Sequence, residues 1–174
     1  MDPSRRRFLL GRRISRIPEV SCSLRPPWAL PEENFLAVCT RCEACVERCP
    51  TQIITRDEKG FPKVDFSRGE CTFCGDCVKS CTDGALWQEG GLTDKPPLPW
   101  KNSGIVVAII SQRCLAQQNV VCRTCGDACT DQAIRFSPQL GGAALPLINT
   151  ERCTGCGACV ATCPAQALSV GVQN

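Results

Sequence analysis

One stretch near the end of the chain has the cysteine spacing of an iron–sulfur site. Cys153 to Pro164 reads C-x2-C-x2-C-x3-C-P. Three thiolates at this spacing can wrap one loop around a cubane 4Fe-4S cluster, whereas the fourth cysteine, about one helical turn later, points toward a second cluster. The stretch therefore predicts one cluster and also predicts a partner motif elsewhere in the chain.

Three further cysteine motifs precede this stretch. Two of them have the regular spacing, and the third is stretched to C-x7-C-x2-C-x3-C. In the third motif, Leu115 to Val121 must loop out or form a helical turn before the chain returns to its cluster, so Cys114 is the least regular ligand. If Cys114 does not coordinate, its site would hold a three-iron or labile cluster.

The ligand sets follow from the rule that the fourth cysteine of each motif ligates the other cluster of a two-cluster module. This rule predicts four 4Fe-4S clusters. Their ligands would be Cys39, Cys42, Cys45 and Cys81 at site 1; Cys71, Cys74, Cys77 and Cys49 at site 2; Cys114, Cys122, Cys125 and Cys163 at site 3; and Cys153, Cys156, Cys159 and Cys129 at site 4. Only Cys22 falls outside the motifs, and it is interpreted as a plain thiol.

Zinc and disulfide bonds are the alternatives to iron–sulfur clusters. Zinc needs only pairs of C-x2-C knuckles, so it leaves the third regular cysteine and the x3-C-P ending unexplained, and it fits the irregular motif best. Disulfides require an oxidising compartment. The chain contains no His, which excludes Rieske centres, imidazole-ligated haem and His-containing zinc sites.

Composition indicates that the clusters also hold the fold together. The chain has 17 Cys in 174 residues but only six Phe, three Trp and no Tyr, which is a thin supply for an apolar core. Crossed ligation would join the beginning of each half to its end. We therefore expect the halves to be poorly folded without their clusters.

The motifs divide the chain into two tandem ferredoxin-like modules of the α+β class. Each module is expected to consist of short helices that carry the fourth cysteine of each motif, together with small β-hairpins, and an extended basic arm precedes the first module. The predicted boundaries are arm 1–33, module A 34–87, linker 88–101 and module B 102–174. The predicted strands are an edge strand at 34–38, a hairpin at 53–56 and 63–65, a return at 85–87, a buried strand at 105–110, a hairpin at 133–136 and 145–148, and a closing strand at 167–170.

Charge sets the arm apart from the modules. Residues 1–27 hold seven Arg against Asp2 and Glu19, a balance of +5 within a chain of net charge +3. The arm lacks aromatic residues between its arginines, so a protein partner or a solvated tail is favoured over nucleic acid. The candidate partner-binding residues are Arg5, Arg6, Arg7 and Trp28. A linker with one packed Trp is the alternative.

The compartment is predicted to be the cytoplasm. Ser4 to Leu9 looks like a twin-arginine export signal. However, the apolar run after its arginines stops at Gly11-Arg12-Arg13, so the segment that an export signal needs is missing. The longest aliphatic stretch, Ile105 to Ile110, is too short to span a bilayer, so no membrane insertion is expected. No Walker loop or dinucleotide fingerprint is present, and no enzymatic activity is predicted.

Several of these features together resemble the NapF family of ferredoxin-type proteins, which are encoded with bacterial periplasmic nitrate reductases. The resemblance rests on Ser4-Arg5-Arg6, Arg25-Pro26-Pro27-Trp28, Gly60-Phe61-Pro62 and the four motifs with an irregular third. It implies a cytoplasmic accessory protein that meets the precursor of the nitrate reductase catalytic subunit and helps it to acquire a 4Fe-4S cluster before export. Thr82 and Thr130 replace the family's proline. A soluble electron carrier is the alternative, and the cysteine spacing supports both functions equally.

Overall fold

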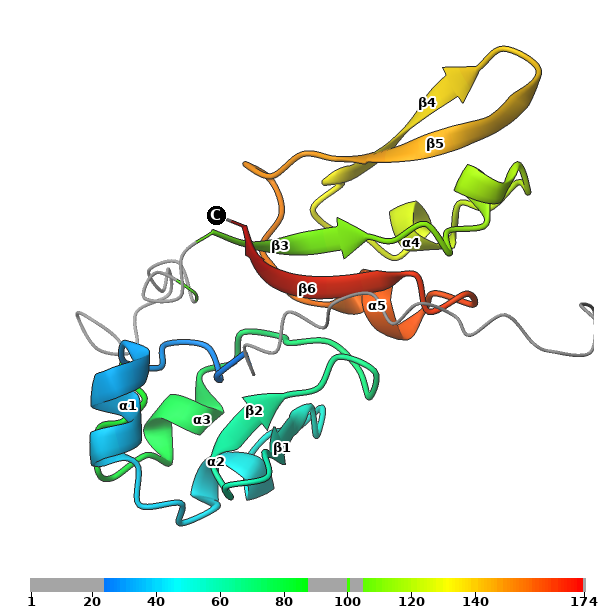
Figure 1. Cartoon of the computed structure of the whole chain (residues 1–174). Helices are drawn as coiled ribbons and strands as arrows, with labels where there is room; N and C mark the ends of the chain where they lie inside the picture. Colours follow the sequence, from blue (N-terminus) through cyan, green and yellow to red (C-terminus); the bar gives the residue numbers. More distant parts are fainter. Residues whose placement is uncertain (1–23, 88–99, 101–104, 174) are drawn as a thin grey trace, which may run out of the picture.

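The computed structural model describes residues 24–87, 100 and 105–173, which form two halves with short helices and two-stranded antiparallel sheets (Figure 1). In Figure 1 module A lies below and module B above, with the β3–β6 pair between module A and the β4–β5 hairpin. The expected α+β class with small hairpins is confirmed for these residues. Among the helices described, none is long and apolar enough to cross a membrane.

Module A is built around one small hairpin. Its elements are α1 (Glu32–Val38), α2 (Ala44–Glu47), β1 (Ile54–Arg56), β2 (Pro62–Val64) and α3 (Asp76–Lys79). β1 and β2 pair antiparallel with Ile54 opposite Val64, which confirms the predicted hairpin. Asp57 closes the turn because its Oδ1 accepts hydrogen bonds from the N–H groups of Lys59 and Phe61, each at 2.9 Å.

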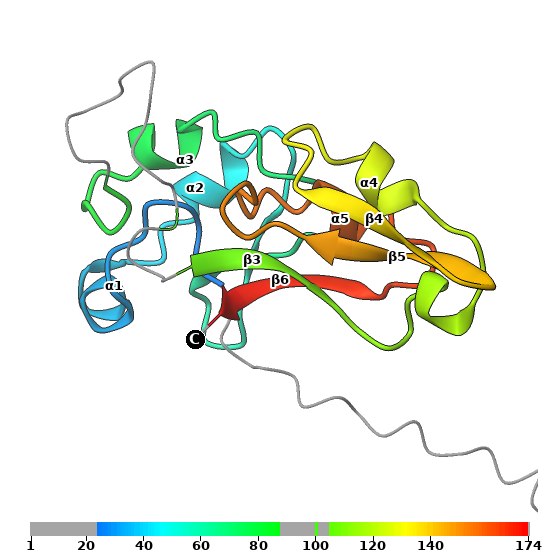
Figure 2. The same ribbon diagram turned by 90° about the horizontal axis from the view of Figure 1, so that it is seen from above.

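Module B has longer strands and closes on itself. Its elements are β3 (Ile105–Ile110), η2 (Ala116–Gln118), α4 (Thr124–Asp127), β4 (Ile134–Gln139), β5 (Gly142–Ile148), α5 (Ala158–Ala161) and β6 (Leu168–Gln173). β4 pairs with β5, and the first strand, β3, pairs antiparallel with the last, β6. Seen from above, both pairs extend along module B (Figure 2). The predicted hairpin and closing strand are confirmed, and the strand at 105–110 forms but is buried only in part, since Ile109 is 43% exposed.

Two predictions about module A are wrong. The edge strand expected at 34–38 is the helix α1, which begins after Pro31 and carries Glu32 and Glu33 in its first turn, where their charges favour a helix N-terminus. Its Phe35 is 0% exposed and anchors it to the core. The strand expected at 85–87 is reduced to one antiparallel bridge between Ala29 and Leu86.

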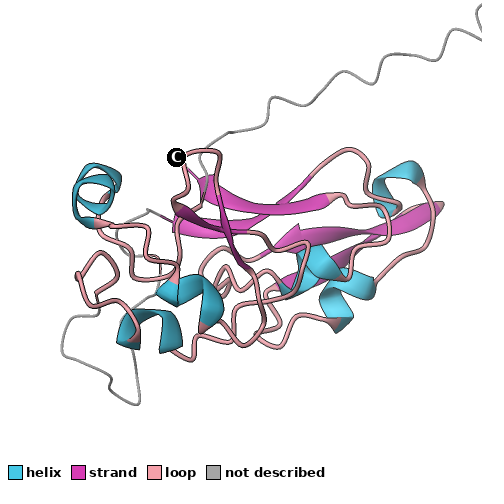
Figure 3. Cartoon of the chain, turned by 90° about the horizontal axis from the view of Figure 1, so that it is seen from below, coloured by secondary structure: helices cyan, strands magenta, loops and turns pink. Residues whose placement is uncertain are grey.

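The short helices carry the third cysteine of each motif, which corrects the expectation that they carry the fourth. The four helices α2, α3, α4 and α5 contain Cys45, Cys77, Cys125 and Cys159, and each helix ends before the fourth cysteine. All four of these side chains are buried. Figure 3 shows the helices as single turns separated by loops, which is the arrangement expected when cysteine-rich loops must enclose a ligand.

The start of the described chain packs into module A rather than extending from it. The Arg25 side chain is 9% exposed and ion-paired with both Glu32 and Asp57. Its guanidinium carbon also lies 5.2 Å from the centre of the Phe35 ring. Trp28 is 4% exposed and packs edge-on against Phe73, so the proposed partner-binding residue lies in the core. Arg5, Arg6, Arg7 and Cys22 lie outside the described residues.

One apolar core joins the two modules. Phe35, Phe66 and Leu86 of module A belong to the same buried cluster as Trp100 of the predicted linker and Val106 of module B. Val160, Val170 and Val172 of module B pack against this cluster. The two halves therefore share a core and are not independent domains joined only by a linker.

Candidate iron–sulfur sites

Site 1 is a cavity lined by all four of its predicted ligands. Its lining includes Cys39, Cys42, Cys45 and Cys81. Burial raises the pKa of the Cys45 thiol to about 12, and the neighbouring thiols of Cys39, Cys81 and Cys42 add to that rise. Four cysteine sulfurs around one cavity form a donor set that a cationic iron–sulfur core would suit.

Site 4 repeats this arrangement in module B. The lining of its cavity includes Cys129, Cys153, Cys156 and Cys159, which is the complete set expected from crossed ligation. The pKa of Cys159 is raised to about 12, first by burial and then by Cys156 and Cys153. Cys129 reaches this cavity from the motif that supplies the other ligands of site 3.

At sites 2 and 3, the predicted ligands lie close enough for their thiols to raise one another's pKa. The pKa of Cys71 is raised to about 12, chiefly by burial and also by the neighbouring thiols of Cys49 and Cys74. The pKa of Cys77 is likewise raised to about 12 by burial and by Cys71.

The structure brings the members of site 3 together in the same way. Cys125 has its pKa raised to about 11 by burial and then by Cys114, Cys122 and Cys163. These are the other three members of the predicted set, and Cys114 is among them despite its irregular spacing.

The insertion after Cys114 is a short 3-10 turn, as the sequence allowed. The N–H of Gln118 donates to the carbonyl of Cys114 at 3.1 Å, and Asn119 takes a left-handed conformation with φ of 63°. Its side-chain Oδ1 accepts a hydrogen bond of 2.8 Å from the N–H of Ala143 on β5. This contact ties the insertion to the β4–β5 hairpin, so the additional residues are accommodated without displacing Cys114.

Backbone N–H groups converge on the fourth cysteine of every motif. Leu86, Ala133 and Ala167 donate to the sulfurs of the cysteines before them, Cys81, Cys129 and Cys163, at 3.2–3.4 Å. At Cys49 burial raises the pKa, but the Thr51 hydroxyl and the N–H groups of Ile53 and Ile54 outweigh burial and lower it. The apolar pair that follows each motif is therefore buried and also supplies donors that stabilise a thiolate.

A threonine–aspartate hydrogen bond closes both cavities, and sequence reasoning missed it. Thr40 donates to Asp83 at 2.6 Å beside site 1, and Thr154 donates to Asp131 at 2.9 Å beside site 4. Each Thr follows the first cysteine of its site, and each Asp lies two residues after the cysteine that crosses over. The sequence signal for this bond is the repeated Cys-Thr-Asp at 81–83 and 129–131, in which Thr82 and Thr130 replace the family's proline.

The donors at these sites fit 4Fe-4S clusters. Each group offers four cysteine sulfurs, of which one is deeply buried and one accepts backbone N–H bonds, and no His is present in the chain. Within the described residues, no three cysteine or acidic side chains converge closely enough to hold a single ion.

Comparison with known proteins agrees with this geometry. The family model described as a 4Fe-4S dicluster domain matches residues 38–85, and that of a 4Fe-4S binding domain matches residues 146–169. The fold and the four cysteine groups thus define a ferredoxin-type protein with 4Fe-4S domains in both halves.

Curated relatives identify the family more closely. The ferredoxin-type protein NapF of Escherichia coli strain K12 is 38% identical over 169 residues, which are 97% of this chain and 94% of the relative. NapF of Haemophilus influenzae is 40% identical and covers 95% and 92% of the two chains. The methylamine utilization ferredoxin-type protein MauM of Methylorubrum extorquens is 34% identical and covers 81% and 68%. The chain belongs to the NapF family of ferredoxin-type proteins.

Proposed function

We propose that this chain binds four 4Fe-4S clusters at sites 1–4 and acts in the cytoplasm as a non-catalytic accessory protein. Its client would be the precursor of a periplasmic nitrate reductase catalytic subunit, which it would help to acquire a 4Fe-4S cluster before export. The single observation that carries the cluster assignment is the pair of cavities whose linings contain every predicted ligand of sites 1 and 4.

The protein's own residues supply what such a cluster needs. Four thiolates bind each cluster, the N–H groups after the fourth cysteine stabilise their charge, and the buried apolar pairs keep water away. The bound clusters would supply one-electron chemistry. In module A the third cysteines, Cys45 and Cys77, are buried while Cys42 and Cys74 are exposed, so this module would hold each cluster firmly on one side and present it on another.

The link to nitrate reductase rests on the names of the NapF relatives and on identity over nearly the whole chain. In the proposed role, Arg5, Arg6 and Arg7 engage the client. Trp28 is omitted because its side chain is buried in module A. No nucleic acid and no membrane insertion form part of this role.

A soluble electron carrier is the second candidate function. It is favoured by the closeness of thiols from neighbouring sites, since Cys45 of site 1 contributes to the raised pKa of Cys77 of site 2. Closely spaced clusters are suited to passing electrons between a donor and a reductase.

One experiment separates the two functions. Holo-protein is incubated anaerobically with cluster-free catalytic subunit, and both cluster appearance in the client and electron transfer to it are followed. The maturation role predicts that the client gains iron while the accessory protein loses it. Rapid electron transfer without cluster gain, together with normal nitrate reductase assembly in cells that lack the protein, would instead establish the carrier role.

A further inference from the structure

The two modules meet directly at cluster-binding loops. The N–H of Cys71, a predicted ligand of site 2, donates a hydrogen bond of 2.8 Å to the carbonyl of Cys156, a predicted ligand of site 4. This backbone bond joins motif 2 of module A to motif 4 of module B. The modules therefore touch where predicted ligands of two different sites lie.

Aromatic side chains fix this junction. The ring of Phe66, from module A, lies so close to Gly157 that any side chain at that position would collide with it. Trp100 donates from its Nε1 to the carbonyl of Thr154 at 3.1 Å and packs edge-on against Phe66, with 6.5 Å between ring centres. Both rings are buried, at 7% and 5% exposure, so water is kept from the contact between the loops.

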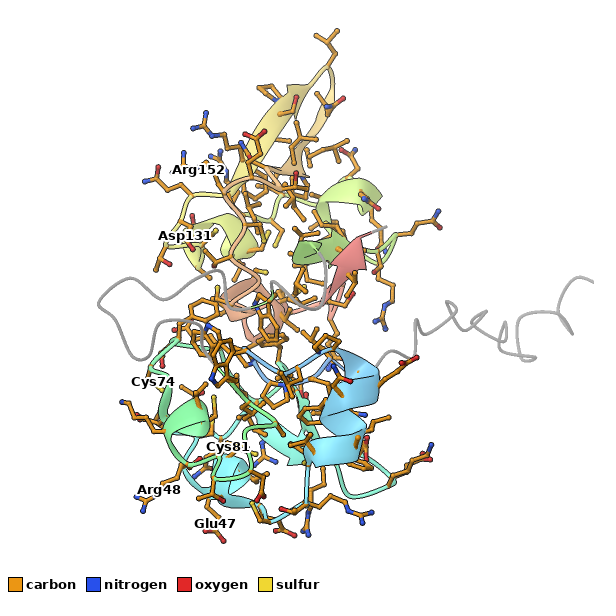
Figure 4. The ribbon with its side chains drawn as sticks, turned by 90° about the vertical axis from the view of Figure 1, so that its left-hand side faces the viewer. Glu47, Arg48, Cys74, Cys81, Asp131 and Arg152 are labelled. Atoms are coloured by element: carbon orange, nitrogen blue, oxygen red, sulfur yellow. The ribbon has the colours of Figure 1, made fainter. Side chains whose placement is uncertain are left out.

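Within each module the two sites also adjoin. Helix α2 packs against α3, which brings together the helices of Cys45 and Cys77, and α4 packs against α5. Cys125 and Cys159, carried by α4 and α5, belong to one buried cluster. In Figure 4, Cys81 of site 1 lies below Cys74 of site 2, and Asp131, which lines site 4, lies above both, in module B.

We propose that the Cys71–Cys156 junction joins the four sites into a single row, in the order site 1, site 2, site 4, site 3, along which one electron can cross from one module to the other. This inference rests on the proposed binding of four clusters. Each transfer oxidises one cluster by one electron and reduces its neighbour by one electron, and no proton or further reactant is involved. Sites 1 and 3 are then the ends of the row, where an external donor and acceptor would exchange electrons.

The test isolates the two sites that meet across the junction. In the full-length chain, the paired substitutions Cys39→Ala with Cys42→Ala and Cys114→Ala with Cys122→Ala each remove two ligands from an outer site, so that fully reduced protein carries its [4Fe-4S]⁺ spins at sites 2 and 4. Dipolar coupling falls with the cube of distance, so two adjoining spins broaden and split the electron paramagnetic resonance spectrum. We expect such a coupled spectrum with about 2 spins per chain.

Phe66→Ala and Phe136→Ala provide the matched comparison. Phe136 lies over Gly126 within module B, as Phe66 lies over Gly157 at the junction. Phe66→Ala is expected to weaken the coupling between sites 2 and 4, whereas Phe136→Ala leaves it unchanged. The same two substitutions are also made in the otherwise unaltered chain, where Phe66→Ala should simplify the spectrum toward two separate pairs at unchanged iron content.

The outcomes distinguish this inference from the proposed function. A narrow, uncoupled spectrum with both inner sites loaded overturns the row of sites and leaves cluster binding intact. Equal spectra for Phe66→Ala and Phe136→Ala in both backgrounds also overturn it. If the spin count shows that site 2 or site 4 is empty although the unaltered chain binds iron, the ligand assignment itself is wrong, and the row falls with it.

Discussion

The hydrogen bond between Thr154 and Asp131 is predicted to slow the release of the cluster from site 4. It joins the loop that begins at Cys153 to the segment that follows Cys129, so it must break before the cavity opens. A hydrogen bond to a charged group contributes about 1.5–3 kcal/mol. Because this bond is only partly buried, we take the lower figure, and Asp131→Ala should then release the cluster about tenfold faster.

The equivalent bond between Thr40 and Asp83 provides an internal comparison. It is exposed to solvent, so Asp83→Ala is expected to accelerate release from site 1 by only about twofold. The assay is anaerobic transfer of iron from holo-protein to an excess of chelator, followed by the loss of visible absorbance. Asp127→Ala, at an exposed acid on the nearby helix α4, is the control for the change in charge.

A double-mutant cycle attributes the effect to the bond itself. Thr154→Val alone should match Asp131→Ala, and the double variant should be no faster than either single variant, because the two substitutions break the same contact. Release from Asp131→Ala at the rate of Asp127→Ala would refute this reasoning, as would fully additive effects of the two substitutions.

Three further predictions concern the ion pair, the crossed ligands and the arm. Arg25→Met should lower the free energy of unfolding of holo-protein by about 3 kcal/mol in denaturant titrations, because it leaves the largely buried Asp57 unpaired. An effect no larger than that of Arg68→Met, at an exposed position, would contradict this prediction. The double variant Cys42→Ala with Cys81→Ala should lose no more iron than either single variant, because both cysteines belong to site 1. The double variant Cys74→Ala with Cys81→Ala should lose about twice as much iron, because these cysteines belong to different sites. The reverse pattern would exclude crossed ligation. Removing residues 1–23 should preserve iron content and weaken client binding in a pull-down, and unchanged binding would exclude the arm from recognition.

The cysteine pattern predicted most of what surrounds the sites. Crossed ligation places Cys81 beside Cys39 and Cys129 beside Cys153, and both pairs line common cavities. The hairpins were predictable for an equally local reason, since a turn such as Asp57–Gly60 between alternating apolar residues specifies its own pairing. These features depend on residues close together in the sequence or on a repeated spacing.

Features that depend on tertiary contacts were not predictable in this way. The segment at 34–38 is short and apolar, which fits a strand as well as a helix. As a helix it buries Phe35 beneath the Arg25 guanidinium, and this contact is not visible in the local sequence. Composition placed Arg25 in a solvated basic arm, but three carbonyl or carboxylate partners make its burial possible. The sequence around Trp28 is equally consistent with partner binding and with a packed side chain, and its burial in the core shows the second.

The junction between the modules was also invisible in the sequence. The neighbour of Gly157 in space is the ring of Phe66 from the other module. A contact across 91 positions of sequence leaves no periodic pattern in either segment. Only the folded chain brings motif 2 and motif 4 together.

Metal analysis of anaerobically purified protein tests the central claim most directly. Four cubane clusters on sixteen motif cysteines predict about 16 iron and about 16 sulfide per chain, without zinc. An iron content near 12 with about one equivalent of zinc would contradict the account and would identify the irregular third motif as a different kind of metal site.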